Sequence, residues 1–354
     1  MLKDPYGKKL VKLSQQDLNT VLHGHARFVA HQGGLRAQLA HANLDGLNLA
    51  NRNLEEVDFT GASLVGASLY GSNLHRVSLY CADLRGCDLR YTKLTRADLR
   101  GASFRGARLS FSMLDNADLR SGTMMYAGVA PTVGTTEHHG VDFSNCSMKG
   151  VSFGNAKLDG ADFTGALLHG AVFKNANITN AVFKDAVLTG VNLEELKVPP
   201  ESLAGAIRDV AADAVAKAGE LKARLQAHED WIASDGKQGA PAALDGADLR
   251  PLGKQFSGRK LAGLSARGTI GIEADFSGSA LQAGKFDGAD LRGANFSRAD
   301  LRGVSFKNAK LAHALFEGAN LGALRLADGN MLAADFTGAV VTDEQMRGAL
   351  RDPS

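Results

Sequence analysis

The sequence is short of several residue types. Aromatic residues make up 6% of the 354 residues, and proline occurs 7 times and cysteine 3 times, whereas glycine occurs 41 times. An odd number of cysteines without a Cys-x-x-Cys pair is typical of a reducing compartment. The formal net charge of +2 demands no strongly charged partner. This composition fits a core of Leu, Phe and Ala in small repeated units better than one of large, varied side chains.

Long hydrophobic runs are also missing. No window reaches eighteen consecutive apolar residues, the length of a membrane-spanning helix. The first residues, MLKDPYGKKLVKLSQQDL, lack the apolar run of a signal peptide. We therefore expect a cytoplasmic protein without a membrane span.

An apolar residue at every fifth position is what the chain has instead. A small residue such as Ala62 or Ala67 stands two positions before most of these apolar centres, as in ASLVG and ADLRG. A period of five fits neither a helix at 3.6 nor a strand at 2, so it indicates an internal-repeat architecture. The centres of the first series run from Leu39, Leu44, Leu49, Leu54 and Phe59 to Leu119 and Met124.

These units resemble those of the pentapeptide repeat proteins, over about two thirds of the chain. The resemblance implies an all-β solenoid: a right-handed quadrilateral β-helix with four pentapeptides per coil, in which the central Leu or Phe and the small residue point inward. The sequence supports the four-sided coil independently, because Phe276, Phe296, Phe316 and Phe336 recur at intervals of twenty. A second phenylalanine set is offset by ten, which predicts ring stacks on two opposite walls.

Slips in the five-residue period predict the domain boundaries. The segments are a terminal region with a capping helix at 1–38, a first solenoid at 39–198 with an extruded loop at 130–140, a helical linker at 199–243, a second solenoid at 244–341 whose period is regular from Phe276 onward, and a C-terminal capping helix at 342–354. We expect Pro199 and Pro200 to end the first solenoid. Helix is expected from about residue 201 to 234, as one rod or as two helices broken at Gly219.

The region around the only tryptophan copies an earlier segment. Residues 22–44 and 225–249 share the pattern L-x-x-H-x-x-aromatic-aliphatic-Ala, which pairs His25 with His228 and Phe28 with Trp231. Residues 198–209 likewise match 341–352. The chain is thus predicted to be a tandem of two modules. Because an open β-helix exposes its end, we expect these helices to be α caps, with both aromatics as buried plugs and both histidines bonded to backbone.

Catalytic and metal-binding motifs do not emerge. The Asp residues that precede central leucines fit a structural role at the coil surface. We therefore expect no enzyme, no cofactor and no metal site. Cys87 and Cys146 occupy inward positions, whereas the register places Cys81 outward, where it could react.

Charge mapped on a period of twenty suggests a basic patch. Arg100 and Arg120 stack on one face, and Arg85 and Arg105 stack on the adjacent face. Neighbouring Asp residues could neutralise the patch, or it could bind an anionic partner. His138 and His139 in the expected loop complete the candidate partner-binding residues.

The favoured function is a rigid scaffold that presents flat faces to a protein partner. The resemblance implies an alternative, a DNA-mimicking protein that binds DNA gyrase and protects it against quinolones or toxins, although such mimicry needs a markedly acidic surface. Direct nucleic-acid binding is not favoured, because only Tyr80 and Tyr91 are available for base stacking. A homodimer through the terminal or linker helices is a further hypothesis.

Overall fold

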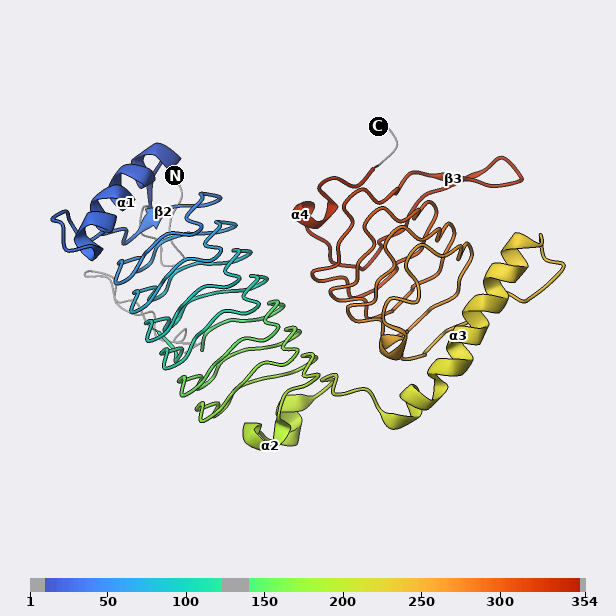
Figure 1. Ribbon diagram of the computed structural model, residues 1–354, viewed down its shortest axis with the longest axis horizontal. Coiled ribbons are helices and arrows are strands. Elements are labelled where there is room, and N and C mark those ends of the chain that lie inside the picture. Colours follow the sequence, from blue (N-terminus) through green and yellow to red (C-terminus); the bar gives the residue numbers. More distant parts are fainter. Residues whose placement is uncertain (1–9, 123–139, 351–354) are drawn as a thin grey trace, which may run out of the picture. The chain divides into compact units, whose positions relative to one another are not determined.

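The computed structural model describes residues 10–122 and 140–350, except for a few side chains in two short helices. The chain divides into two compact units, Met1–Asp209 and Val210–Ser354, each with its own hydrophobic core. Figure 1 shows the first unit in blue to green and the second in yellow to red; each consists mainly of stacked coils with a helix near its beginning.

Both units are built from coils whose backbones pair in parallel at intervals of about twenty residues. Ser63 pairs with Asn43 on the preceding coil and with Asp83 on the next. The amide of Leu44 donates to the carbonyl of Ser63 at 2.7 Å, and the amide of Ser63 donates to the carbonyl of Ala42 at 2.9 Å. The pattern recurs every five residues, so each coil has four sides, as the sequence predicts.

Each side ends at a corner where the backbone turns. The fifth residue of a unit adopts a positive φ, for example 69° at Gly46 and 56° at Asn51. Glycine enters this left-handed region without a steric penalty, and asparagine enters it more readily than other residues. This explains why Gly and Asn recur at the end of so many five-residue units.

The core consists of the central residues of the units. Phe143, Phe163 and Phe183 stack with ring centroids 5.1 and 4.9 Å apart, and Phe153 stacks on Phe173 at 5.0 Å. Rings of one stack meet those of the other edge to face, as between Phe153 and Phe163. The predicted phenylalanine stacks on opposite walls are confirmed in this unit, and all but Phe173, which is 3% exposed, are fully buried.

In the second unit the expected stack is wrong at its last member. Phe336 lies against Phe306 with centroids 5.1 Å apart, whereas it meets Phe316 edge to face. The reason is an insertion, because Ser305 pairs with Asp335, thirty residues away instead of twenty. The extra residues form an antiparallel hairpin of strands β3 (Leu324–Arg325) and β4 (Met331–Leu332). Two whole units were inserted, so the period stayed regular and the sequence alone did not reveal the hairpin.

An insertion also interrupts the first unit. Ser103 pairs with Asp142, thirty-nine residues away, and Phe104 stacks on Phe143 at 5.0 Å. The coil therefore continues on the far side of nineteen additional residues. The loop expected at 130–140 falls within this insertion, outside the described residues except for Gly140.

The expected end of the first solenoid at residue 198 is wrong. The coils continue past Pro199 and Pro200, because the amide of Leu188 donates to the carbonyl of Ile207 at 2.7 Å. Pro200 begins a short 3-10 helix, η1 (Pro200–Leu203), after the four-residue helix α2 (Leu193–Leu196). Backbone pairing with the preceding coil thus outweighs the helical preference of this alanine-rich segment.

Within the expected linker, the α-helix begins only at α3 (Ala212–Ala233), which runs through Gly219 without a break. The linker therefore contains η1 and one α-helix, and Gly219 does not divide that helix. The C-terminal helix, α4 (Asp343–Met346), is also shorter than the expected 342–354, and Leu350 returns to the ladder opposite Asn320. Another short 3-10 helix, η2 (Arg250–Leu252), lies where the period slips near residue 250.

The first unit begins with strand β1 (Val11–Lys12), which pairs in parallel with β2 (Ala42–Asn43). Helix α1 (Gln15–Val29) follows, and Ser14 and Asp17 close its N-terminus by reciprocal hydrogen bonds, a capping box. The side chain of Gln15 bonds both backbone groups of Asn48, at 2.8 and 3.0 Å. These bonds hold α1 against the first coil.

Candidate functional site on the outer faces

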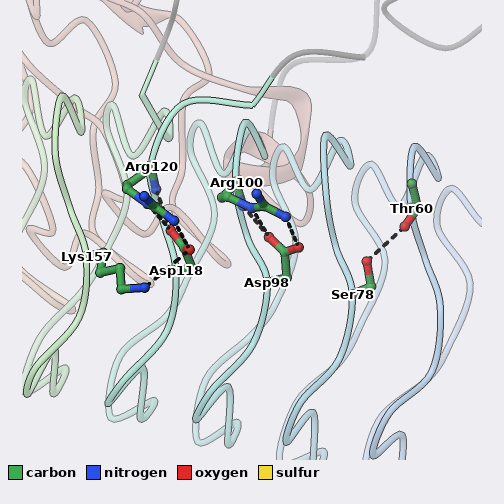
Figure 2. A network of polar contacts seen from close by, with 7 residues as sticks. All are labelled: Thr60, Ser78, Asp98, Arg100, Asp118, Arg120 and Lys157. Carbon is green, nitrogen blue, oxygen red and sulfur yellow. Dashed lines mark hydrogen bonds and ion pairs between the residues drawn. The ribbon is translucent and has the colours of Figure 1, made fainter. Parts of the chain in front are cut away.

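Asp-Leu-Arg triplets form the most regular polar feature of the outer faces. Nε of Arg100 donates to Oδ1 of Asp98 at 2.9 Å, and Nη2 donates to Oδ2 at 2.7 Å. Figure 2 shows this fork beside the equivalent one of Arg120 and Asp118 on the next coil. Residues i and i+2 of a strand point the same way, so Asp and Arg meet outside while Leu is buried. The described residues contain seven such pairs: Asp83–Arg85, Asp88–Arg90, Asp98–Arg100, Asp118–Arg120, Asp248–Arg250, Asp290–Arg292 and Asp300–Arg302.

The forks keep both partners charged. The hydrogen bond with Asp98 raises the pKa of Arg100. Burial raises the pKa of Asp118, but the hydrogen bonds from Arg120 outweigh it and leave that pKa below its ordinary value. A carboxylate held ionised by a bidentate arginine is poorly suited to donate protons. This agrees with a structural role for the Asp residues.

The structure separates the four arginines singled out from the sequence. Arg85, Arg100 and Arg120 each form a fork with the Asp two residues earlier, so much of their charge is neutralised. Arg105 is exposed, and no ion pair within the described residues involves it. His138 and His139 lie outside the described residues. The local balance of Asp and Arg therefore describes this patch better than an unopposed basic surface.

Two buried histidines join helices to coils. Nδ1 of His25 accepts a hydrogen bond from the amide of Ala37 at 3.3 Å, and Nδ1 of His228 accepts one from the amide of Ala242 at 2.9 Å. Both rings are completely buried, and burial lowers the pKa of each below its ordinary value of 6.5. The equivalent contacts agree with the internal duplication, including the two extra residues of the second turn.

The histidines differ at Nε2. In His228 this nitrogen is 3.1 Å from the carbonyl of Ala262, which fixes the neutral form with the proton on Nε2. In His25 it has no hydrogen-bond partner within the described part of the chain, although the carbonyl of Glu55 lies near it.

The aromatic residues of the two helices are not buried plugs. Phe28 is 37% exposed and Trp231 is half-buried. Leucines occupy the covering position instead: Leu18 and Leu22 belong to the core of the first unit, and Leu221 and Leu225 to that of the second. These leucines and the histidine are spaced i, i+4, i+7, which is one helix face. The aromatic residue three positions later lies beyond the buried part of that face.

The outward placement expected for Cys81 is also wrong. Cys81 is 2% exposed and lies at a corner with φ 52°. A Cβ atom placed on Gly101, the equivalent corner of the next coil, would lie 3.0 Å from its sulfur. Corner residues of successive coils therefore cover one another. Cys87 and Cys146 are buried as expected, and burial raises the pKa of both thiols.

The described residues, 10–122 and 140–350, contain no group of three or more His, Cys, Asp or Glu side chains that could hold a metal ion. Within the same residues, no helix is long and apolar enough to cross a membrane.

The comparisons with known proteins agree with the coil geometry. A family model described as pentapeptide repeats matches residues 37–76, 53–90, 82–120, 139–175, 166–197 and 285–322, which together span just over half of the chain. The chain belongs to the pentapeptide repeat family. Its fold is accordingly a right-handed quadrilateral β-helix, and the matching family is not a catalytic one.

Solved structures of pentapeptide repeat proteins are also similar. HetL of Nostoc sp. strain PCC 7120, involved in heterocyst differentiation regulation, is 19% identical over 86% of this chain and 96% of its own, with a TM-score of 0.23. QnrB1, a plasmid-mediated fluoroquinolone resistance protein, is 15% identical over 88% and 94%, with a TM-score of 0.23. A protein of the Arabidopsis thaliana thylakoid lumen is 21% identical over 29% and 80%, with a TM-score of 0.18. No curated protein matches.

Two surface features were not predicted from the sequence. The forks were visible as repeated Asp-x-Arg, because i and i+2 share a strand face. The second feature is a row of exposed aromatic side chains, Tyr70, Tyr91 and Phe111. The spacing of twenty between Tyr91 and Phe111 was the available signal, since it places both at the same corner of adjacent coils.

Proposed function

We propose that this protein is a non-enzymatic scaffold in which two solenoids, each covered by a helix at its first coil, present their outer faces to a protein partner. The observation that carries the proposal is the filled interior. Central residues such as Leu84, Phe163 and Phe296 are completely buried, coil after coil. Groups that could recognise a partner therefore lie on the outside.

The forks argue against the alternative, DNA mimicry toward gyrase. A protein that imitates the DNA backbone must present unneutralised negative charge along one face. Asp83, Asp88, Asp98 and Asp118 of the first unit each bind an arginine within their own strand. Their carboxylates are therefore unavailable as phosphate mimics.

Affinity capture with the full-length chain tests the scaffold function. The immobilised protein is incubated with native lysate of the source organism, and captured proteins are quantified against a bait-free support. Arg105→Glu reverses an exposed charge of the first unit, and Arg325→Glu, an exposed arginine of the second unit, is the matched control. We expect at least one protein to be enriched reproducibly. If nothing is enriched by the wild-type chain, the scaffold proposal is overturned.

A parallel assay addresses gyrase directly. Purified gyrase supercoils plasmid DNA in the presence of micromolar concentrations of this protein, with and without a quinolone. We expect neither inhibition of supercoiling nor protection from drug-stabilised cleavage. A clear effect on either would reinstate the gyrase alternative.

A further inference from the structure

Tyr70, Tyr91 and Phe111 form a continuous row on the outside of the first unit, which we call the aromatic stripe. Their exposed fractions are 37, 52 and 47%. The ring centroids of Tyr70 and Tyr91 are 5.5 Å apart, and those of Tyr91 and Phe111 are 5.2 Å apart and nearly parallel. Three adjoining exposed rings are more than the scattered apolar residues normal on a protein surface.

Two of the three rings stand where the backbone disfavours them. Tyr91 has φ 59° and Phe111 has φ 62°, at corners that Gly or Asn occupies in many coils, as at Gly46 and Asn51. A bulky side chain in the left-handed region costs conformational energy. Strained residues that do not fill the core point to a role at the surface.

The flanks of the stripe are basic. The Arg90 guanidinium lies 5.4 Å from the ring centroid of Tyr70. Arg90 and Arg108 share a single carboxylate, that of Asp88, at 2.7 and 3.1 Å. On the other side Lys93 is exposed, and no ion pair within the described residues involves it. Three cations, Arg90, Arg108 and Lys93, therefore lie beside the stripe.

The remaining neighbours extend this picture. Met113, 44% exposed, pairs with Lys93 across adjoining coils and widens the apolar surface. Asp115 on the same strand directs a carboxylate oxygen toward Oγ of Ser152, from which it accepts a hydrogen bond at 2.7 Å. The surface is thus apolar along its middle and positive at its edge.

The spacing of the rings selects the shape of the occupant. The ring centroids of the stripe are 5.2 to 5.5 Å apart, which matches the pitch of an α-helix, about 5.4 Å. Side chains on one face of a β-strand recur instead at about 6.8 Å. Stacking of nucleic-acid bases on the stripe is hindered, because Tyr91 and Phe111 cover each other and a Cβ on Gly150 would lie 3.0 Å from the Phe111 ring.

We propose that the aromatic stripe binds an acidic amphipathic α-helix of a partner protein. One turn of the helix lies on each coil, its apolar face covers Tyr91 and Phe111, and its carboxylates meet Lys93 and the Arg90–Arg108 pair. This inference rests on the proposed scaffold function and specifies the chemistry of the partner.

The test uses a synthetic helix as the probe. A fluorescein-labelled peptide of about five turns carries Leu on one face, at i, i+3, i+4 and i+7, and Glu elsewhere. Binding to the full-length protein is followed by fluorescence anisotropy. Comparison probes are the same peptide with Lys for Glu, a scrambled peptide of identical composition, and an oligothymidylate.

The variant Tyr91→Asn/Phe111→Asn removes the rings and keeps the corners foldable, because Asn adopts the same φ at Asn51 and Asn116. Tyr80→Ser removes a ring two sides further along the coil and is the matched control. We expect the acidic helix to bind wild type and Tyr80→Ser equally, and the double variant at least about tenfold more weakly. Thermal unfolding confirms that the double variant is folded.

Other outcomes overturn the proposal. Equal binding by the double variant would remove the stripe from the interaction, and equal binding of the scrambled peptide would remove the helix. Oligothymidylate binding that depends on the rings would identify nucleic acid as the occupant, and stripe-dependent self-association in sedimentation would identify a second copy. Lysate capture that persists in the double variant while the acidic helix fails to bind would leave the scaffold function standing without the stripe.

Discussion

Helices α1 and α3 each contact the first coil of their unit through a buried histidine, and the two histidines differ in the hydrogen bonding of Nε2. His228 has backbone partners at both nitrogens, whereas His25 has one among the described residues. In the second unit Glu229 adds a salt bridge to Arg259 at 2.8 Å and accepts from the amide of Lys260. The first unit relies instead on the capping box before α1 and on Gln15. Copies of one segment thus retain a buried contact and diverge in the polar bonds around it.

One Asp-Leu-Arg fork of the second unit is far more buried than a fork of the first. Asp290 and Arg292 of the second unit have side chains 12 and 3% exposed, while those of Asp98 and Arg100 are 34 and 40% exposed. One sequence pattern therefore serves in a desolvated and in a solvated setting. Burial, which the triplet itself does not encode, decides what the pair contributes to stability.

The largest expected difference between the units comes from this pair of forks. Asp290→Ala removes the carboxylate from a buried arginine and should cost about 3 kcal/mol or more. Asp98→Ala exposes its arginine to water and should cost about 0.5 kcal/mol. Because two units need not unfold together, hydrogen exchange resolved by mass spectrometry is the suitable measurement. Similar losses from both substitutions would contradict the role assigned to burial.

Substituting the histidines compares the two helix contacts. His228→Ala deprives two backbone groups of their partner, the amide of the buried Ala242 and the carbonyl of the half-buried Ala262, and should cost about 3 kcal/mol. His25→Ala deprives one amide and should cost about half as much. Exchange protection of α3 and of α1 reports the two effects separately. A larger loss at α1 would reverse the comparison.

Acidification should weaken both contacts. Burial holds the pKa of His25 and of His228 below 6.5, so near and below this pH the unfolded chain binds protons that the folded chain does not. The contribution of the neutral histidines is complete above pH 6.5 and is lost as the pH falls toward their folded-state pKa values. Urea unfolding at pH 7.5 and 5 measures the loss. His25→Gln/His228→Gln should be less sensitive over this range, and an unchanged pH dependence would contradict the assignment.

The smallest expected effect concerns the β3–β4 hairpin, an insertion that the last coil of the first unit does not share. Deleting residues 324–333 restores a spacing of twenty between Ser305 and Asp335. A shorter loop closes at lower entropic cost, while the deletion also removes the packing of Leu332 beside Gly303. We expect the stability of the second unit to change by less than about 1 kcal/mol.

A five-residue deletion, 324–328, is the informative control. It leaves half of the hairpin and shifts Phe336 by one side of the coil, away from Phe306. It should therefore destabilise the end of the second unit more than the ten-residue deletion. Thermal unfolding of both variants decides the point. If the shorter deletion is the milder one, the register explanation fails.

The five-residue period predicted the coils and the inward residues because burial depends on the position of a residue within its five-residue unit. It did not predict the hairpin, since two inserted units preserve the phase around Phe336. The segment before α3 was predicted as helix from its alanine content, but Ile207 gains ladder bonds with the preceding coil. For the caps, aromatic size suggested Phe28 and Trp231, whereas the helix face places leucines over the coil.

The candidate surface was predicted only in part. The arginine columns follow from the period of twenty, but their neutralisation depends on side-chain geometry between i and i+2. The aromatic stripe needed residues from different positions of a unit, Tyr70 and Tyr91, and no single column of the sequence contains both. Exposure at a corner also depends on the next coil, as the burial of Cys81 shows.

The hairpin has a consequence for how such a chain can lengthen. A gene built from repeated five-codon segments can gain or lose any whole number of five-residue units by copying errors. The backbone ladder between coils stays in register only if the number of added units is a multiple of four, which is one coil. In the second unit the remainder is two units, and β3 and β4 carry it outward so that Phe336 still meets Phe306. The protruding hairpin therefore holds the two extra five-residue units outside the ladder, so that the coils on either side of it still pair in register.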